Sequence, residues 1–489
     1  MRVPGFIGGS YESQAYTADQ ERTVNFYYEN IESQGTSKRA ALLPTPGVST
    51  LSTAVVTPGR AHFFENDREF AVIGPTLYEI DSFGALTSRG TVATNSNPAT
   101  ISSNGDGGDE LFITSGGNGY ILDLPTNVLT QIVNLNAKAT MGDHLDGYFL
   151  ALDDASSTLY ISKLLDGQTW TTGVDFAQRS IASDPWRAMK VVGRYIWMLG
   201  EVTSEVWYNV GTTFPFAPYP SGLIQYGIAA PFSAAIADAQ LMWLGNTRFG
   251  GGYVLKAAGF QPEVVSSFAT QKVFDEYTTV DDAQAFAYSD LGHTHYVLSF
   301  PRENTTFNYD LQTRLWTERG TWDAKTNSYL AWRPRWHVRA FNEHRLLDSS
   351  GGQVYKMRSD LLNDVDSIVI RRLRRAPAME SENETIFYSA FELDLDTGLG
   401  ISGTGQGSNP QVMMRMSDDG GKTWGTERMR TAGKIGEYQT RVRWDRLGRA
   451  RRRVFEVVMT DPAPWRITGA YVELGQRPAT MGGGGPQGG

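Results

Sequence analysis

Residues 295–320 read HYVLSFPRENTTFNYDLQTRLWTERG. The apolar run at 296–300 predicts one β-strand, and residues 307–311 alternate apolar with polar side chains, as a second, half-buried strand does. Residues 310–313 have the composition of a turn, and an extended run restarts at 315–316. This stretch therefore predicts a small antiparallel sheet made of consecutive strands.

Looser copies of this unit recur along the chain, each a short apolar strand, a glycine-rich or polar turn and a strand rich in Tyr, Val and Leu. With the stretch above they make about seven copies, spaced by about 35–55 residues, the period of propeller blades. A closed ring buries both faces of each sheet and leaves only short edges. We predict an all-β fold, a six- or seven-bladed β-propeller over residues 56–360, and leave stacked sandwiches open as an alternative. The other copies are residues 70–80, 111–124, 148–161, 195–208, 241–255 and 344–356.

The rest of the chain differs from the repeats. Residues 1–55 are expected to hold an extended N-terminal arm and the first strands, with one strand at 21–29. Pro4, Pro44 and Pro46 with scattered glycines indicate an arm or a closing segment and not a core element. After residue 360 the predicted strands lengthen, and we expect a second, sandwich-like β domain over residues 361–478. Residues 479–489 are expected to form a flexible, glycine-rich tail.

Composition excludes several kinds of chemistry. The 489 residues contain no cysteine, which removes disulfides, thiolate nucleophiles and cysteine-bound zinc. His293 and His295 lie two positions apart on one predicted strand, a spacing more typical of surface residues than of a metal site.

We find no signal peptide or membrane-spanning run, and expect a soluble product made in the cytoplasm. The net charge of −9 argues against bulk attraction to nucleic acid.

The sharpest local motif is SDDGGKTW at residues 417–424, which resembles the Asp-box of sialidases. In that motif Asp caps backbone amides, Gly takes a positive φ and Trp covers a hairpin, so its role is structural. A sialidase-like glycosidase or carbohydrate-binding propeller therefore stays open as an alternative. Only one clean box is present, and it lies outside the repeats. The matching residues are Ser417, Asp419, Gly421, Thr423 and Trp424.

Two basic runs stand out near the C-terminus. Phosphate binding is one interpretation, but alternation along a predicted strand favours a solvated face or a protein–protein contact, where arginine is enriched. We see no catalytic set, cofactor loop or metal-ligand pattern, and we predict no enzyme activity, cofactor or metal. The candidate interface residues are Arg371, Arg372, Arg374, Arg375, Arg441, Arg443, Arg446, Arg449, Arg451, Arg452 and Arg453.

The order of several weaker matches adds a family resemblance. The chain resembles the packaged-DNA stabilisation proteins of short-tailed bacteriophages, the tail hub or nozzle family. The resemblance rests on residues 22–30 with 42–51 (LLPTPGVSTL), 186–211 (WRAMKVVGRYIWMLGEVTSEVWYNVG), 225–231 (QYGIAAP) and 444–474, which ends in ITGAYVEL. It spans nearly the whole length, and the glycine-rich tail after residue 480 departs from it.

The resemblance implies a structural protein of the virion tail. Members are expected to assemble as a homo-oligomeric ring, six copies in this family, below the portal and tail adaptor proteins. Such a ring retains packaged double-stranded DNA, forms part of its ejection conduit without reading its sequence, and contacts a tail needle, fibre or tailspike. An acidic lumen would let DNA slide, because like charges repel across water.

Overall fold

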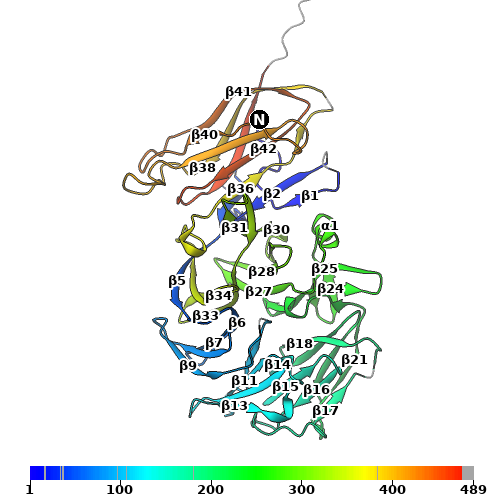
Figure 1. Cartoon of the computed structure of the whole chain (residues 1–489). Helices are drawn as coiled ribbons and strands as arrows, with labels where there is room; N and C mark the ends of the chain where they lie inside the picture. Colours follow the sequence, from blue (N-terminus) through cyan, green and yellow to red (C-terminus); the bar gives the residue numbers. More distant parts are fainter. Residues whose placement is uncertain are drawn as a thin grey trace, which may run out of the picture. The chain divides into compact units, whose positions relative to one another are not determined.

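The computed structural model describes residues 1–475 except 16–17, 34, 36–37, 96, 106, 180 and 383. The chain divides into two compact units. Residues 45–370 form the first, and residues 1–44 together with those from 371 onward form the second. Both units are built from β-strands (Figure 1). The expected tail at 479–489 lies outside the described residues.

The first unit is a β-propeller with seven sheets, all antiparallel (Figure 1). Each sheet has four strands, except the fifth, where two short strands share the innermost position. Blade one is β6 (Gly59–Glu65), β7 (Arg68–Ile73), β8 (Thr76–Ile80) and β9 (Leu86–Thr91); blade two is β10 (Thr100–Ser103), β11 (Glu110–Ser115), β12 (Asn118–Asp123) and β13 (Val128–Ile132); blade three is β14 (Met141–Leu145), β15 (Tyr148–Asp153), β16 (Thr158–Ile161) and β17 (Phe176–Gln178). Blade four is β18 (Trp186–Val192), β19 (Tyr195–Gly200), β20 (Ser204–Asn209) and β21 (Phe216–Ile224); blade five is β22 (Gly227–Ile228), β23 (Ala235–Ala237), β24 (Gln240–Thr247), β25 (Gly250–Ala258) and β26 (Gln261–Val264). Blade six is β27 (Gln284–Asp290), β28 (His293–Phe300), β29 (Thr305–Asp310) and β30 (Leu315–Glu318); blade seven is β33 (Pro334–Ala340), β34 (Glu343–Asp348) and β35 (Gln353–Arg358) with β5 (Gly47–Thr53).

The innermost strands of most successive blades contact one another around the ring, β19 contacts β22 between the fourth and fifth blades, and β33 of the last blade contacts β6 of the first. The closing strand β5 precedes β6 in sequence but pairs with β35 of the last blade. The last blade is thus built from both ends of the propeller segment, which closes the ring. A short hairpin, β31 (Gly320–Asp323) with β32 (Ser328–Ala331), and the helix α1 (Phe268–Glu276) lie outside the seven sheets.

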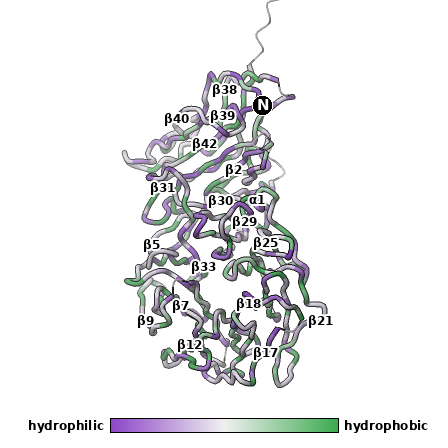
Figure 2. Tube along the Cα trace, turned by 45° about the vertical axis from the view of Figure 1, so that its right-hand side comes forward, coloured by the Kyte–Doolittle hydropathy of each residue, from purple (hydrophilic) through white to green (hydrophobic). Residues whose placement is uncertain are grey.

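The predicted repeats match one feature of every blade. Each copy coincides with the hairpin formed by the second and third strands, and residues 295–320 fall on β28, β29 and β30. These middle strands are buried along much of their length, as in β28, where all eight residues are buried. Some outer strands are short and largely exposed, such as β13 and β26. Hydrophobic and hydrophilic residues therefore alternate along much of the trace (Figure 2).

The second unit is a β-sandwich, as expected for the region after residue 360. One sheet runs in the order β3, β4, β43, β38, β41, and the other in the order β2, β36, β42, β39, β40, with β1 on β2 and β37 on β42. Their bounds are β1 (Tyr11–Glu12), β2 (Gln20–Val24), β3 (Phe26–Asn30), β4 (Ala40–Pro44), β36 (Arg372–Arg375), β37 (Met379–Glu380), β38 (Ile386–Leu395), β39 (Gln411–Ser417), β40 (Arg428–Thr431), β41 (Val442–Ala450), β42 (Arg452–Met459) and β43 (Ile467–Leu474).

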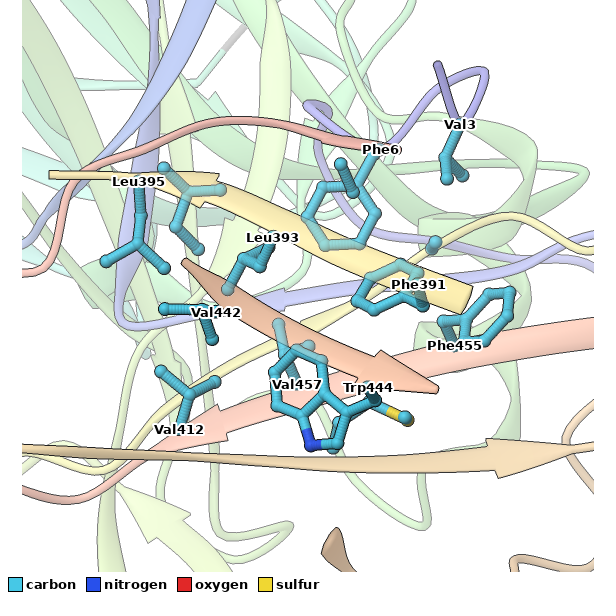
Figure 3. Packing of buried hydrophobic residues seen from close by; sticks show 14 of the residues in the cluster. Val3, Phe6, Phe391, Leu393, Leu395, Val412, Val442, Trp444, Phe455 and Val457 are labelled. Carbon is cyan, nitrogen blue, oxygen red and sulfur yellow. The ribbon is translucent and has the colours of Figure 1, made fainter. Parts of the chain in front are cut away.

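The N-terminal segment differs from the predicted arm. Val3, Phe6, Phe26 and Leu42 are buried in the sandwich core, and Figure 3 shows Phe6 packing among core side chains such as Phe391. Backbone pairing holds the segment as well, because Val3 N donates to Ala470 O at 2.8 Å. The expectation that the segment contributes nothing to the core was wrong, whereas β5, which lies within residues 1–55, does close the propeller. Its prolines and glycines obscured apolar residues that fill the interior of a sheet pair formed largely by distant sequence.

Candidate interaction surface

The structure separates the candidate arginines by burial. All of them belong to the sandwich unit. The side chains of Arg372, Arg374 and Arg453 are buried, those of Arg371, Arg375, Arg443 and Arg452 are half-buried, and those of Arg441, Arg446, Arg449 and Arg451 are exposed. The two basic runs are therefore divided between the interior and the surface, and only part of each is available to a partner.

Arg374 fastens the N-terminal segment to the sandwich. Its Nε donates to Phe6 O at 2.6 Å and its Nη1 donates to Gly9 O at 2.8 Å. It also forms an ion pair with Glu21, a carboxylate whose pKa is raised by burial. A guanidinium carries five donors in a fixed fork, so one side chain can satisfy several buried acceptors at once. Arg374 therefore has an internal structural role.

Glu456 is the centre of a second buried ion network. It is fully buried on β42, and its carboxylate accepts from Arg375 Nε at 2.9 Å and from Arg415 Nε at 2.6 Å. The same two guanidiniums lie over the Trp424 ring, at 5.0 and 4.7 Å from its centroid. Burial of a carboxylate is tolerated when it is paired in this way. Sequence reasoning missed Glu456, although a lone acidic residue inside an apolar strand was the available signal.

Arg453 also points inward. Its Nε and Nη2 donate to the two carboxylate oxygens of Asp418 at 2.7 and 2.8 Å, and Nη1 donates to Leu447 O at 2.7 Å. Its guanidinium lies 4.6 Å from the centroid of the Tyr388 ring. Its bonds therefore connect β42 to the β39–β40 loop and to β41.

The exposed arginines gather on and beside β41, an edge strand of its sheet. Arg441 pairs with Glu392, and Arg443 pairs with Asp445 at 2.8 Å. Val442 and Trp444, which alternate with these two arginines along the chain, are buried. This is the predicted pattern of a strand with one solvated face. Among the residues that the structure describes, no carboxylate lies within ion-pair distance of Arg446, Arg449 or Arg451. These three exposed cations are therefore available to a partner. In the sequence, Leu447, Gly448 and Ala450 lie between these three arginines.

The Asp-box-like motif folds the connection from β39 to β40. Asp419 Oδ1 accepts from the backbone amides of Lys422 and Thr423 at 2.9 Å each. Gly421 has a φ of 99° and donates its amide to Ser417 Oγ at 2.8 Å. Hydrogen bonds from Ser417 and Thr423 lower the pKa of Asp419 well below its usual range. The motif thus has the geometry of a structural turn, and Trp424 places its ring beside the Glu456 network.

The histidine pair lies in the propeller and is buried rather than on the surface. His293 Nδ1 lies 2.7 Å from Asp310 Oδ2, and the rings of His293 and His295 stack with centroids 5.9 Å apart. Within the described residues no group of three or more His, Cys, Asp or Glu side chains is arranged to hold a metal ion. No helix among these residues is long and apolar enough to cross a membrane.

Comparison with known families identifies both units. Residues 2–362 match the family model described as Bacteriophage P22 Gp10, beta-propeller, and residues 371–475 match the one described as Bacteriophage P22 Gp10, beta-sandwich. The chain belongs to the Bacteriophage P22 Gp10 family of phage stabilisation proteins. This confirms the predicted family, propeller and sandwich.

More distant likenesses concern solved structures. The N-terminal domain of Nup159 has 11% identity and a TM-score of 0.41, covering 69% of this chain and 98% of that chain. A streptogramin B lyase has 10% identity and a TM-score of 0.41, covering 64% and 98%. The extracellular domain of BT4673 from B. thetaiotaomicron has 10% identity and a TM-score of 0.42, covering 75% and 43%. No curated protein matches the chain.

Proposed function

We propose that this protein is a structural, non-enzymatic component of the virion tail, a nozzle or hub ring below the portal and tail adaptor proteins. In this role it retains packaged double-stranded DNA and later forms part of the conduit for ejection. The observation that carries the proposal is that two models of one phage stabilisation family together match nearly the whole chain. The ring is made of six copies synthesised in the host cytoplasm, and it also contacts a tail needle, fibre or tailspike.

The propeller suits a wall element of such a conduit. Its seven sheets bury their faces against neighbouring blades, and its closing strand β5 joins the first and last parts of the propeller segment. A closed ring of sheets leaves few free edges and resists local opening. A stiff unit of this kind keeps the shape of a channel during the passage of DNA.

Charge supports the same role. The net charge of −9 disfavours tight binding to the DNA phosphates, so DNA can move past an acidic wall. The exposed arginines Arg446, Arg449 and Arg451 lie on or beside an edge strand, where basic side chains also discourage unwanted strand pairing. We propose that these arginines contact an acidic surface of a neighbouring tail protein or of a second copy.

Electron microscopy of the purified protein mixed with its portal–adaptor complex tests this function. A ring docked coaxially on the adaptor, together with loss of packaged DNA from particles that lack the protein, is the expected result. A stable monomer that neither docks nor restores DNA retention would overturn the proposal. Cleavage of a glycosidic substrate by that monomer would favour the carbohydrate-active alternative.

A further inference from the structure

The axis of the propeller contains a cavity that the proposed tail role does not use. Its volume is about 190 Å³, several times the roughly 30 Å³ that a water molecule occupies in the liquid. It is lined by the innermost strands of the blades, where strand edges face the axis. Six of the lining residues are polar or charged, one from each of six strands: His62, Thr100, Asp143, Lys190, Gln284 and Arg335.

Arg335 is the unusual member of this lining. Only 7% of its surface is exposed, and its Nη1 donates to Gln284 Oε1 at 2.8 Å. Its Nε is buried without a hydrogen-bond partner. Burial lowers the pKa of Arg335 to about 10, so the guanidinium stays charged at neutral pH. A buried cation is costly unless a counter-charge and acceptors meet it.

No carboxylate among the described residues lies within ion-pair distance of Arg335. Asp282 and Asp348 are the acidic groups that act on it electrostatically. Asp348 is already bound by Arg333 and by the Tyr355 hydroxyl, the latter at 2.6 Å. Asp282 accepts from Arg302 N at 2.9 Å through one oxygen and leaves the other buried without a partner. The positive charge of Arg335 is therefore incompletely compensated.

The backbone beside Arg335 is strained. Trp336 has a φ of 52°, which is rare for a bulky residue, and the register of β33 shifts between Arg335 and Val338. Bulges of this kind commonly re-aim a side chain, and such strain is concentrated at functional sites. Here the bulge brings Trp336 O to 2.9 Å from His62 Nδ1, on the neighbouring blade.

The surrounding charges do not offset Arg335. His62 Nε2 lies 2.8 Å from Glu69 Oε1, and Arg345 Nη1 lies 2.5 Å from the other oxygen of Glu69. That carboxylate therefore already has a cationic partner of its own. Asp143, the acidic residue in the lining, accepts from Val191 N at 2.8 Å and has Lys190 Nζ 3.8 Å away. Arg335 is thus the buried cation of the lining, with a donor that has no partner and no carboxylate paired to it among the described residues.

We propose that this axial cavity binds a small oxyanion, a phosphate or a carboxylate, with Arg335 as its counter-charge. The planar guanidinium fork matches the geometry of both groups. The cavity volume suits inorganic phosphate or a short carboxylate and is too small for a nucleotide within its walls. Gln284 holds the guanidinium in place by accepting one of its hydrogen bonds.

Isothermal titration and thermal unfolding of the full chain test the site, with inorganic phosphate and acetate as probes at matched ionic strength in chloride. Arg335→Gln removes the counter-charge, and Arg194→Gln is the control, since Arg194 is an exposed arginine in the β18–β19 turn. We expect one of the probes to bind the wild type and Arg194→Gln, and to bind Arg335→Gln at least about tenfold more weakly. The probe that binds identifies phosphate or carboxylate as the ligand class.

Binding of neither probe, or equal binding to all three proteins, would overturn the proposal. If Arg335→Gln does not fold, Asp282→Asn decides the matter. That change removes the nearby acidic group that competes with the anion for Arg335, so it should tighten binding. Unchanged or weaker binding by Asp282→Asn would then count against the site.

Discussion

Arg374 in the sandwich and Arg335 in the propeller are both buried, but their surroundings differ. Arg374 has an ion pair with Glu21 and donates to backbone carbonyls of the N-terminal segment. Arg335 has one amide partner and a buried Nε without any. Arg374 is matched by its partners and fastens the fold, whereas Arg335 has an unpartnered donor beside a cavity, and the proposed anion site rests on that difference.

Histidine is divided between the two units as well. All six histidines of the chain fall within residues 45–370, and four of them lie close together in the sixth and seventh blades. Tyr288 is at the centre of this cluster, with ring centroids 4.9 Å from His295, 5.8 Å from His337 and 6.1 Å from His344. The sandwich has no histidine, so the two units should respond differently to mild acid.

The largest expected effect of a single substitution comes from breaking the compensated network of the sandwich. Glu456→Gln leaves Arg375 and Arg415 without their shared carboxylate, and we expect a loss of about 3 kcal/mol in the free energy of unfolding. Urea unfolding of the full chain, followed by tryptophan fluorescence, measures it. Asp396→Asn is the control, because its pair with Arg466 is about half exposed and should change stability by less than about 1 kcal/mol. Equal effects of the two changes would contradict the comparison.

Mild acid should act on the propeller and spare the sandwich. Burial lowers the pKa of His295 to about 4, and burial together with His344 lowers the pKa of His337 to about 3. Since both histidines bind protons near pH 6.5 when unfolded, their contribution to stability is full above that pH. It decreases as the pH falls toward 4 and then 3, with a loss of up to about 3 kcal/mol for His295 and about 5 kcal/mol for His337.

Hydrogen exchange measured by mass spectrometry at pH 7.5, 6 and 5 localises this effect. After correction for intrinsic exchange rates, peptides from residues 284–348 should lose protection as the pH falls, while peptides from 384–475 should not. Asp310 adds nothing in this pH range. Burial raises its pKa but the bond to His293 and the nearby histidines lower it overall, so its contribution to stability is lost only below about pH 4. His337→Gln should reduce the pH dependence. Equal loss of protection in both units would remove histidine as the cause.

A smaller effect is expected at the closing strand of the propeller. A Cβ at Gly47, the first residue of β5, would lie 2.5 Å from the carbonyl oxygens of Leu361 and Asn363. Both contacts are with backbone, which cannot move aside cheaply, so Gly47→Ala should cost about 1–3 kcal/mol. Gly173→Ala is the control, because no atom lies within 4 Å of its new Cβ. Urea midpoints of the two variants give the measurement, and equal midpoints would mean that β5 adapts.

The middle strands of the blades were predictable from the sequence, and the rest of each blade was not. The hairpin of β28 and β29 is a pair of apolar or alternating runs, because buried strands need such residues. Outer strands such as β13 are mostly exposed and carry little pattern. The N-terminal core residues were missed for a related reason. Val3 and Phe6 stand in short segments, and only pairing with β43, more than 460 residues away, shows their role.

The candidate site was predictable only as a composition. The arginine runs are plain in the sequence, but burial depends on which face of β36 or β42 meets the other sheet. Arg374 and Arg375 are neighbours in sequence, yet one is bound by the N-terminal segment and the other by Glu456. The axial residue Arg335 had no signal in its own segment, because the cavity is lined by six strands that are far apart in the sequence and converge on one axis.

The smallest effect on stability is expected where arginine has no internal partner. Arg449→Glu with Arg451→Glu reverses two exposed charges beside the β41 edge, and we expect a change in the free energy of unfolding within about 0.5 kcal/mol. Under the proposed tail role the same variant should lose docking to the portal–adaptor complex, scored by electron microscopy. Arg194→Glu, an exposed reversal in the propeller, should keep it. Loss of stability without loss of docking would assign these arginines to the fold, and the sandwich would then use its surface cations as it uses its buried ones.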